Sequence, residues 1–306
     1  MSSNKKIYTA AIIGAGRIGS GFDAPGAKRA LTHAHAIAKH PRMRLVALVD
    51  TDARRGKREA QRWNTAFYAG LDEMYAKEKP DIIVIATPDG THATLLADIV
   101  ALRPKLLICE KPIAATPAQA ARLRRLFARS RVPVIVNYTR RFDKTVVALR
   151  GQLRAGRFGK VVCASALYTG GLLHNGSHAV DLARYLFGEM TGTSGGAATF
   201  ERCPRFYCMD GGEEFFVFEF DILTERGRLR FSDSGFARSA EAVVRDRLYR
   251  GFRNLGKPVR RTTELEDALP ELYRHARAVL EGAERPRSSA QDALNTYEAC
   301  MRIAKQ

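Results

Sequence analysis

At residues 10–19 the chain reads AAIIGAGRIG, a short apolar run that leads directly into a glycine-rich loop. The run Ala10–Ile13 contains no polar residue and predicts a buried strand. In the G-x-G-x-x-G spacing, the first glycine allows a tight turn and the second lets a pyrophosphate approach the backbone. The third lets a helix pack closely on the strand. The loop residues are Gly14, Ala15, Gly16, Arg17, Ile18 and Gly19. This stretch therefore predicts a phosphate-binding loop at the edge of a parallel sheet.

A second strand and an acidic residue follow the glycine loop. The apolar segment Leu45–Val49 predicts the strand, and Asp50 comes directly after it. A carboxylate at this position can accept hydrogen bonds from both hydroxyls of a ribose. Strand, glycines, second strand and acid, in this order, predict a dinucleotide site. We expect NAD rather than NADP, because a 2′-phosphate would meet the negative charge of Asp50, although Arg54 and Arg55 could bind such a phosphate.

The distance from the glycines to the acid is unusually long. The acid is expected about 20 residues beyond the glycines, whereas 31 positions separate Gly19 from Asp50. We place the excess in Ser20–Thr32, which is rich in glycine and proline, and we expect the next helix to begin near His33. This insertion is interpreted either as a flap over the cofactor or active site, or as an inert surface excursion.

Strands alternate with helices over the first 140 residues, which predicts a doubly wound parallel sheet with right-handed crossovers. Ligands of such sheets bind beyond the carboxyl ends of the strands. In this chain those ends are Thr87–Pro88, Glu110–Pro112 and Asn137–Tyr138, in addition to the glycine loop and Asp50. The further predicted strands are Phe67–Ala69, Ile82–Ala86, Lys105–Cys109 and Val132–Val136, and the helices are Ala53–Trp63, Asp72–Lys77, His92–Leu102 capped by Thr91, and one that starts at Thr116–Pro117.

The second half of the chain has a different pattern, with several long strands and few intervening helices. The predicted strands are Val161–Tyr168, Phe215–Phe220, Leu229–Phe231 and, less clearly, Glu241–Leu248, followed by helices near Leu265–Glu281 and Ala290–Ala304. We therefore expect an α/β protein with a Rossmann domain at 1–140 and an α+β domain at 141–306 built on an open, mostly antiparallel sheet. The run Glu214–Phe220 reads as a strand with apolar residues on both faces, which predicts a homodimer or homotetramer.

Composition limits the possible partners. The 306 residues carry a net charge of +18, but the basic residues are spread over predicted helix faces, which argues against nucleic acid as a partner. No apolar run approaches the roughly 20 residues of a membrane helix. The polar segment Met1–Lys6 leads directly into the first strand and leaves no room for a signal peptide, so we expect a cytoplasmic protein. The five cysteines are scattered without zinc-site spacing, and we expect no bound metal.

Over nearly the whole chain, the motifs resemble the Gfo/Idh/MocA oxidoreductases, the family of glucose–fructose oxidoreductase and inositol dehydrogenase. In chain order they are GAGRIG at 14–19, VD at 49–50, ATPDGTH at 86–92, EKP at 110–112, NYTRRFD at 137–143 and GGLLHNGSHAVDLARYLFG at 170–188. The resemblance implies NAD or NADP on the Rossmann domain and a sugar, polyol or nucleotide-sugar against the second sheet. It also implies hydride transfer between a carbinol carbon and the nicotinamide ring.

The resemblance assigns roles to individual residues. Lys111 of EKP would lie beside the reacting hydroxyl, with a proline after it that is often cis, and His178 would be its proton-transfer partner. Family members commonly have an aspartate four residues before that histidine, whereas this chain has His174. His174 could relay a proton, contact substrate or fill the space of the aspartate. The H-N-G-S-H motif is similar to a branch thought to act on surface-polysaccharide sugars.

The candidate site residues thus form three groups. The catalytic candidates are Lys111 and His178. The substrate-binding candidates are His174, Asn175, Asp181, Tyr138 and Arg141, of which the last three could equally be structural. The cofactor-binding candidates are Gly14, Gly16, Arg17, Ile18, Gly19, Asp50, Thr87, Pro88, His92, Glu110 and Lys111.

Two rival classes of function are open on the same sequence. A non-catalytic regulator of this fold could sense NAD(H) or a sugar, but the intact Lys111 and His178 argue against it. A DNA-binding repressor is disfavoured because the chain has no recognisable helix-turn-helix.

Overall fold

The computed structural model describes residues 6–305. The described chain forms two compact units, each treated by itself below. The first runs to Thr139 and includes Glu266–Leu294, and the second consists of Arg140–Leu265 with the segment from Asn295 onward. The segment Glu266–Leu294, which the sequence alone places in the second domain, therefore lies with the first sheet. Among residues 6–305, no helix combines the length and apolarity needed to cross a bilayer.

The first unit is built on a six-stranded parallel sheet, as the sequence predicts. Its strands are β1 (Tyr8–Ile13), β2 (Met43–Val49), β3 (Ala66–Tyr68), β4 (Ile82–Ile85), β5 (Leu106–Cys109) and β6 (Val134–Val136), in the order β3-β2-β1-β4-β5-β6. All neighbouring pairs are parallel. The central strands β4 and β5 are apolar and fully buried, as expected of parallel strands covered on both faces. This is the strand order of a Rossmann fold.

The helices of this unit begin where the sequence supplies capping groups. They are α1 (His33–Lys39), α2 (Ala53–Arg62), α3 (Leu71–Glu78), α4 (His92–Leu102), α5 (Pro117–Arg129) and α8 (Ala268–Leu280). The start of α1 at His33 confirms the insertion before it, and the Thr32 side chain accepts the His35 N–H as the N-cap. The predicted cap at Thr91 is wrong in detail, because its hydroxyl donates to the carbonyl of Pro88 instead of accepting a helix N–H.

The second unit is built on a nine-stranded, mostly antiparallel sheet, which confirms the predicted class. Its strands are β7 (Val161–Tyr168), β8 (Met190–Ser194), β9 (Ala197–Phe200), β10 (Cys203–Asp210), β11 (Phe218–Thr224), β12 (Gly227–Ser232), β13 (Ala237–Arg245), β14 (Arg253–Leu255) and β15 (Val259–Thr262). The order is β14-β13-β12-β11-β7-β10-β9-β8, with β15 paired to β13, and β7–β10 is parallel. The sequence alone does not identify β8–β10, β14 or β15.

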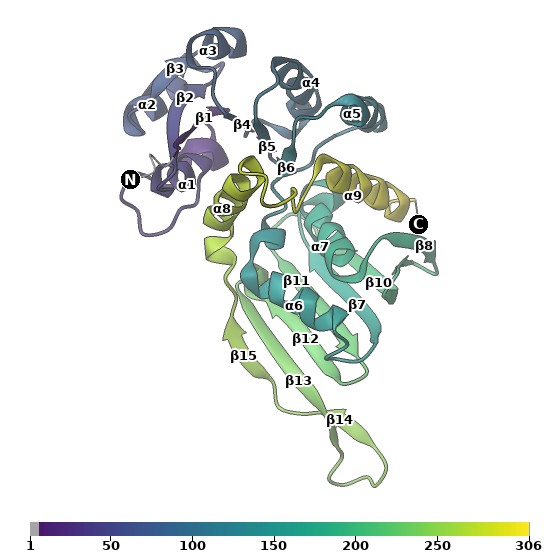
Figure 1. The fold of residues 1–306 in the computed structure, drawn as a ribbon. Helices are drawn as coiled ribbons and strands as arrows, with labels where there is room; N and C mark the ends of the chain where they lie inside the picture. Colours follow the sequence, from purple (N-terminus) through teal and green to yellow (C-terminus); the bar gives the residue numbers. More distant parts are fainter. Residues whose placement is uncertain (1–5, 306) are drawn as a thin grey trace. The chain divides into compact units, whose positions relative to one another are not determined.

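Helices cover one face of this second sheet (Figure 1). They are α6 (Lys144–Arg154) and α7 (Ser177–Phe187), and the last helix of the chain, α9 (Ala290–Ile303), contributes Ala299 and Cys300 to a cluster with Val180 of α7. Aromatic rings fill the space beneath α7. Phe187 lies with its ring centroid 6.2 Å from that of Phe220, which is 5.6 Å from Phe206. The core of this unit therefore lies between α7 and the inward side chains of the central strands.

One predicted strand needs correction. The segment Phe215–Phe220 is not a strand throughout, because β11 begins only at Phe218. Phe218 and Phe220 are buried in the core, whereas Phe215 and Phe216 are 68% and 58% exposed in the loop before the strand. The run is therefore not a strand with two apolar faces. The reason is a long-range contact: the Thr169 hydroxyl binds the backbone at Phe215 and Val217, groups that strand pairing would otherwise use.

Candidate active site

The three glycines of the loop have three different environments. Gly14 has a φ of +99°, and a Cβ there would lie 2.5 Å from the Ala86 carbonyl oxygen. A Cβ on Gly19 would lie 2.0 Å from the Gly14 carbonyl oxygen, whereas no atom lies within 4 Å of the Cβ position of Gly16. The first and third glycines are thus required by tight turning and close packing, and the second faces open space. This is the arrangement that a pyrophosphate needs to approach the backbone.

After the loop the chain makes one π-helical turn, Arg17–Gly21. The Gly21 N–H donates to the Gly16 carbonyl at 3.0 Å and the Phe22 N–H to that of Arg17 at 2.9 Å. π-Helical turns are rare in proteins and are frequent at functional sites. Arg17 is exposed and Ile18 is half-buried in this turn. Both remain candidates for contact with a cofactor phosphate.

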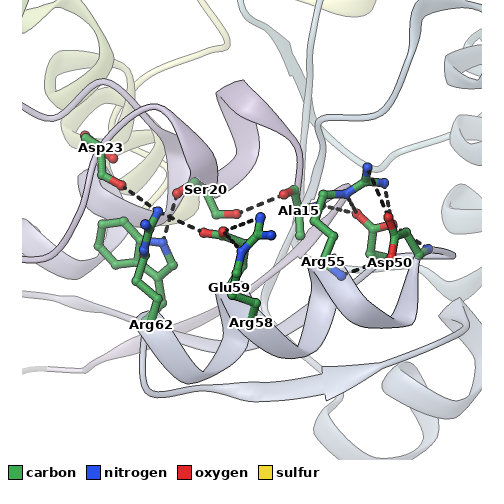
Figure 2. A network of polar contacts seen from close by, with 10 residues as sticks. Ala15, Ser20, Asp23, Asp50, Arg55, Arg58, Glu59 and Arg62 are labelled. Carbon is green, nitrogen blue, oxygen red and sulfur yellow. Dashed lines mark hydrogen bonds and ion pairs between the residues drawn. The ribbon is translucent and has the colours of Figure 1, made fainter.

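The insertion Ser20–Thr32 is a well-anchored loop. The Asp23 carboxylate accepts hydrogen bonds from the Leu31 N–H and the Thr32 hydroxyl, both at 2.5 Å, and lies 2.8 Å from Nδ1 of His35. Helix α2 holds the other side, where Trp63 Nε1 donates to the Ser20 carbonyl at 3.0 Å. Figure 2 shows the side chains of α2 reaching toward this segment and toward Asp50. The insertion therefore has a defined conformation beside the glycine loop.

Figure 2 shows Asp50 at the right of the network, hydrogen-bonded to Ala15 and Arg55. Its carboxylate accepts the N–H groups of Ala15 and Asp52, each at 2.8 Å. Arg55 adds two bonds, from Nε at 3.0 Å and from Nη2 at 2.7 Å. Asp50 thus ties the glycine loop to the start of α2, and the Arg55 side chain, 42% exposed, lies at its outer side.

These bonds determine the charge of Asp50. Burial alone would raise the pKa of the carboxyl, but the hydrogen bonds from Arg55, Asp52 and Ala15 outweigh burial and hold the pKa below its usual value. The same pairing raises the pKa of Arg55. The pair is therefore an ionised carboxylate and a guanidinium, and either group can meet the ribose end of a dinucleotide.

His92 lies behind the carboxyl ends of two strands. Its ring nitrogens lie 2.8 Å from the carbonyl oxygens of Thr87 and Pro112. The ring is fully buried, while Thr87 is half-buried and Pro88 exposed. His92 therefore joins the segments that follow β4 and β5 from the interior of the protein. Thr87 and Pro88 are left at the surface, where a ligand could contact them.

Glu110 takes part in a buried network that sequence reasoning missed. Its Oε1 accepts from Asn137 Nδ2 at 2.7 Å and lies 2.9 Å from Nε2 of His33. The Nδ1 atom of His33 lies 2.7 Å from the hydroxyl of Tyr273 in α8, with the two rings edge to face. His33 and Tyr273 are fully buried. No local motif signals these two residues, because Tyr273 is 240 positions beyond His33.

The network keeps Glu110 ionised. Burial favours the neutral acid, but the hydrogen bond and charge of His33, the Asn137 amide and the nearby Lys111 together lower the pKa of Glu110. Burial and the charge of Glu110 raise the pKa of Tyr273 well above its ordinary value. A fixed negative charge therefore lies directly next to Lys111, which is half-buried and joined to Pro112 by a cis peptide bond.

In the second unit, the H-N-G-S-H motif begins as a π-helical turn, Gly171–Gly176, and continues into α7. His174 is exposed in this turn, and His178 is half-buried as the second residue of the helix. The Asn175 side chain donates from Nδ2 to the Thr169 carbonyl at 2.7 Å. Asn175 therefore closes the turn that presents His174.

Asp181 and Arg141 form a buried ion pair. Arg141 Nε lies 2.8 Å from Oδ2 of Asp181 and Nη2 lies 2.8 Å from Oδ1, while the Thr296 hydroxyl donates to Oδ1 at 3.0 Å. Both ionic side chains are almost completely buried. These two parallel bonds hold the Arg141 guanidinium against α7. Tyr138, also proposed for substrate contact, is buried in the first unit.

No group of three or more potential metal ligands occurs within residues 6–305. The residues described above suit a dinucleotide. Gly16 leaves open space at the loop, Asp50 is an ionised acid after β2, and Lys111 follows the end of β5.

Comparison with known proteins adds a family to this geometry. A family model described as an oxidoreductase family with an NAD-binding Rossmann fold, Gfo/Idh/MocA, matches residues 8–138. Over these residues the chain matches the Gfo/Idh/MocA family. The matched segment covers the glycine loop, Asp50 and Lys111, so the family assignment and the site geometry concern the same residues.

Relatives of this family support the assignment over part of the chain. Inositol 2-dehydrogenase of Rhizobium meliloti is 28% identical over 192 residues, which cover 58% of this chain and 54% of the relative. The chain thus spans about half the length of the curated relatives that it matches.

Solved structures resemble the whole chain. The WlbA dehydrogenase of Bordetella pertussis, solved with NADH and UDP-GlcNAcA, has a TM-score of 0.75 at 18% identity, covering 100% of this chain and 96% of that one. The 3-ketoreductase KijD10 of Actinomadura kijaniata, solved with TDP-benzene and NADP, has a TM-score of 0.76 at 15% identity, covering 98% of each chain. At such identities the likeness establishes the fold over both units.

Proposed function

We propose that this protein is a nicotinamide-dependent oxidoreductase of the Gfo/Idh/MocA type that interconverts a carbinol and a keto carbon of a sugar, polyol or nucleotide-sugar. The observation that carries the proposal is the glycine loop, in which Gly16 faces open space between two glycines that cannot bear a side chain. A loop that only connected two elements would not need this combination. Bound NAD or NADP would supply the hydride acceptor or donor, and the glycine loop and Asp50 would hold it.

Lys111 is the proposed acid–base group for the substrate hydroxyl. It follows β5 at the carboxyl end of the sheet, where ligands of this fold bind. The ionised Glu110 next to it, fixed by His33 and Asn137, gives the lysine a constant electrostatic environment. A positioned ammonium can stabilise the oxygen that develops negative charge, and its neutral form can accept the hydroxyl proton.

His178 is proposed as the partner that exchanges this proton, and His174 as a substrate contact. His178 lies in the first turn of α7, which the buried Arg141–Asp181 pair holds in place. His174 is exposed on the turn before the helix, so its ring is available to a hydroxyl group of the sugar. Loss of His174 should therefore raise the Michaelis constant and leave the shape of the pH–rate profile unchanged.

NAD is the proposed physiological cofactor. A ribose diol can share the Asp50 carboxylate with the loop, whereas a 2′-phosphate would gain Arg55 but would approach an ionised carboxylate. Calorimetric titration with NADH and NADPH tests this choice, and tighter binding of NADPH would contradict it.

Turnover tests the main proposal. The protein is incubated with NAD⁺ or NADP⁺ and a panel of polyols, free sugars and UDP-sugars, and with NADH or NADPH and the corresponding keto sugars. Reduction or oxidation of the nicotinamide at 340 nm, abolished in Lys111→Ala, is the expected result. NADH binding without turnover on any substrate of the panel would favour the rival function, a sensor of NAD(H).

A further inference from the structure

Thr169 joins two segments of the second unit that are far apart in the sequence. Its hydroxyl donates to the Phe215 carbonyl at 2.7 Å and accepts the Val217 N–H at 2.9 Å. Its own carbonyl accepts Nδ2 of Asn175 at 2.7 Å. Next to it, the Gly170 N–H donates to the Gly212 carbonyl at 2.8 Å. The loop 211–217 is therefore fixed against the turn that carries His174.

This loop exposes two aromatic side chains. Phe215 and Phe216 are 68% and 58% exposed, although Phe218 and Phe220, which follow in the same run, are buried. Thr169 is the cause, because its two bonds hold the backbone out of the strand until Val217. Two adjacent exposed phenylalanines on an anchored loop present apolar surface that is available to a ligand.

We propose that Phe215 and Phe216 form a stacking surface for the sugar ring of the substrate, an inference that rests on the proposed function. The apolar C–H face of a sugar or cyclitol can pack on an aromatic ring, while its hydroxyls bond to neighbouring polar groups. His174 stands on the adjacent turn and supplies one such group. The stacking surface selects for a ring with one apolar face.

The charge of the same loop narrows the substrate class. Glu213 and Glu214 precede the two phenylalanines and are both exposed. Carboxylates accept hydrogen bonds from hydroxyl or ammonium groups and repel phosphates. The loop therefore favours a neutral or amino-substituted free sugar or polyol over a sugar that carries a nucleoside diphosphate.

Kinetics of surface variants test the stacking surface. The Phe215→Ala and Phe216→Ala variants are assayed with myo-inositol, free hexoses and UDP-GlcNAcA, using the substrate of the panel that turns over fastest. Each variant should raise the Michaelis constant roughly 2- to 12-fold, the range for one aromatic contact, with little change in kcat. Phe215→Tyr and Phe216→Tyr should restore most of the loss, because they restore the ring.

Phe252 supplies a matched control. It is 68% exposed, as Phe215 is. It lies next to β14, in a hairpin at one end of β13, whereas Phe231 pairs near the other end of β13. Phe252→Ala should leave the Michaelis constant unchanged. An equal effect in Phe252→Ala, or a change in mass by light scattering in the Phe215 and Phe216 variants, would overturn the proposal in favour of a general surface or association effect.

The double variant Glu213→Gln/Glu214→Gln tests the substrate class. It should improve kcat/KM for UDP-GlcNAcA relative to myo-inositol several-fold, and a ratio that stays constant would contradict the charge argument.

Wild-type turnover with unchanged Michaelis constants in the phenylalanine variants would overturn the stacking surface alone. If the wild type shows no turnover, the proposed function fails, and saturation-transfer NMR with myo-inositol and NADH decides the stacking surface. A signal reduced by Phe215→Ala supports it, and no signal overturns it.

Discussion

Lys111 and His178 are expected to act on the proton that moves during turnover, so their loss should affect the rate far more than cofactor binding. A positioned acid–base group contributes about 10²- to 10⁴-fold to the rate, and Lys111→Ala and His178→Ala should each lower kcat by that amount. The dissociation constant of NADH, measured by calorimetry, should stay nearly constant because Asp50 and the glycine loop are intact. Full activity of Lys111→Ala on the true substrate would overturn the mechanism.

The buried His33 side chain should stabilise the fold in a pH-dependent manner. Replacing it in His33→Leu removes the imidazole from the buried Glu110 carboxylate and leaves Asn137 as the side-chain donor described there, which should cost about 3 kcal/mol of unfolding free energy at pH 7. Because the pKa of Glu110 is lowered in the folded protein, its ionised carboxylate stabilises the fold at pH values above the ordinary pKa of 4.5. This stabilisation is lost as the pH falls through the lower pKa of the folded state.

The stability difference between wild type and His33→Leu should therefore narrow on acidification below about pH 4.5. Chemical denaturation at pH 7, 5 and 4 measures it. Tyr273→Phe is the milder companion variant, since it removes one hydroxyl from the network and should cost about 1 kcal/mol. A difference that stays constant with pH would show that His33 acts through packing alone.

Residues recognised from the sequence and residues found only in the structure differ in how far apart their partners lie. Gly14, Gly16, Gly19 and Asp50 belong to a local motif whose spacing carries a physical meaning. His33 and Thr169 could not be found this way, because their partners lie 240 and 46 positions away. No short-range pattern records such contacts.

At the scale of elements, the insertion Ser20–Thr32 is the feature most open to test. Asp23 accepts two hydrogen bonds within the loop and meets His35 of α1, so Asp23→Ala should loosen it. If the insertion is a flap over the cofactor or substrate, the Michaelis constants for both should change in Asp23→Ala and in a variant that lacks the loop. Limited proteolysis checks that the loop has become accessible in Asp23→Ala.

Unchanged Michaelis constants in a folded variant without the loop would make the insertion an inert excursion. Lys39→Ala is a useful control, because Lys39 binds the outer backbone of the same loop through the carbonyls of Ala27 and Lys28. It should increase mobility at the periphery without altering the anchored base.

The two sheets also differ in how well the sequence predicts them. Strands such as β4 and β5 are continuous apolar runs between turn residues, so their place in a buried parallel sheet can be predicted. Strands such as β8 and β15 are short and largely exposed, with few apolar residues, and only pairing with a neighbour defines them. The strand predicted from Phe215 begins late because a side chain competes for its backbone groups.

At the scale of the whole molecule, a homodimer or homotetramer remains a prediction, and its basis is now the outward face of the second sheet. The outward face of the second sheet, opposite to the buried rings of Phe206 and Phe220, carries exposed apolar side chains. They are Leu167, Tyr207, Met209 and Leu223, brought to one face by the pairing of β7 with β10 and β11. A sheet face of this kind is commonly covered by a second copy.

Light scattering at micromolar concentration should give a multiple of the 33.9 kDa chain mass. Replacing two residues of this face together, Leu167→Glu and Leu223→Glu, should reduce the mass to that of one chain, because like charges would then oppose each other across the interface. Val259→Glu, an equally polar change at an exposed residue of β15, is the control. A monomeric wild type would contradict the prediction.

The position of α8 has a consequence for how the protein is made. The nucleotide-binding unit is discontinuous: it runs to Thr139 and resumes only at Glu266–Leu294, where Tyr273 reaches back to His33. On a ribosome that adds about 5 to 20 residues per second, the first part waits roughly 8 to 30 s for its last helix. During that interval residues 140–265 of the second unit are synthesised, while His33 and Glu110 lack the cover of Tyr273. The first unit therefore begins folding first but can be completed only after residues 140–265 of the second unit have been synthesised.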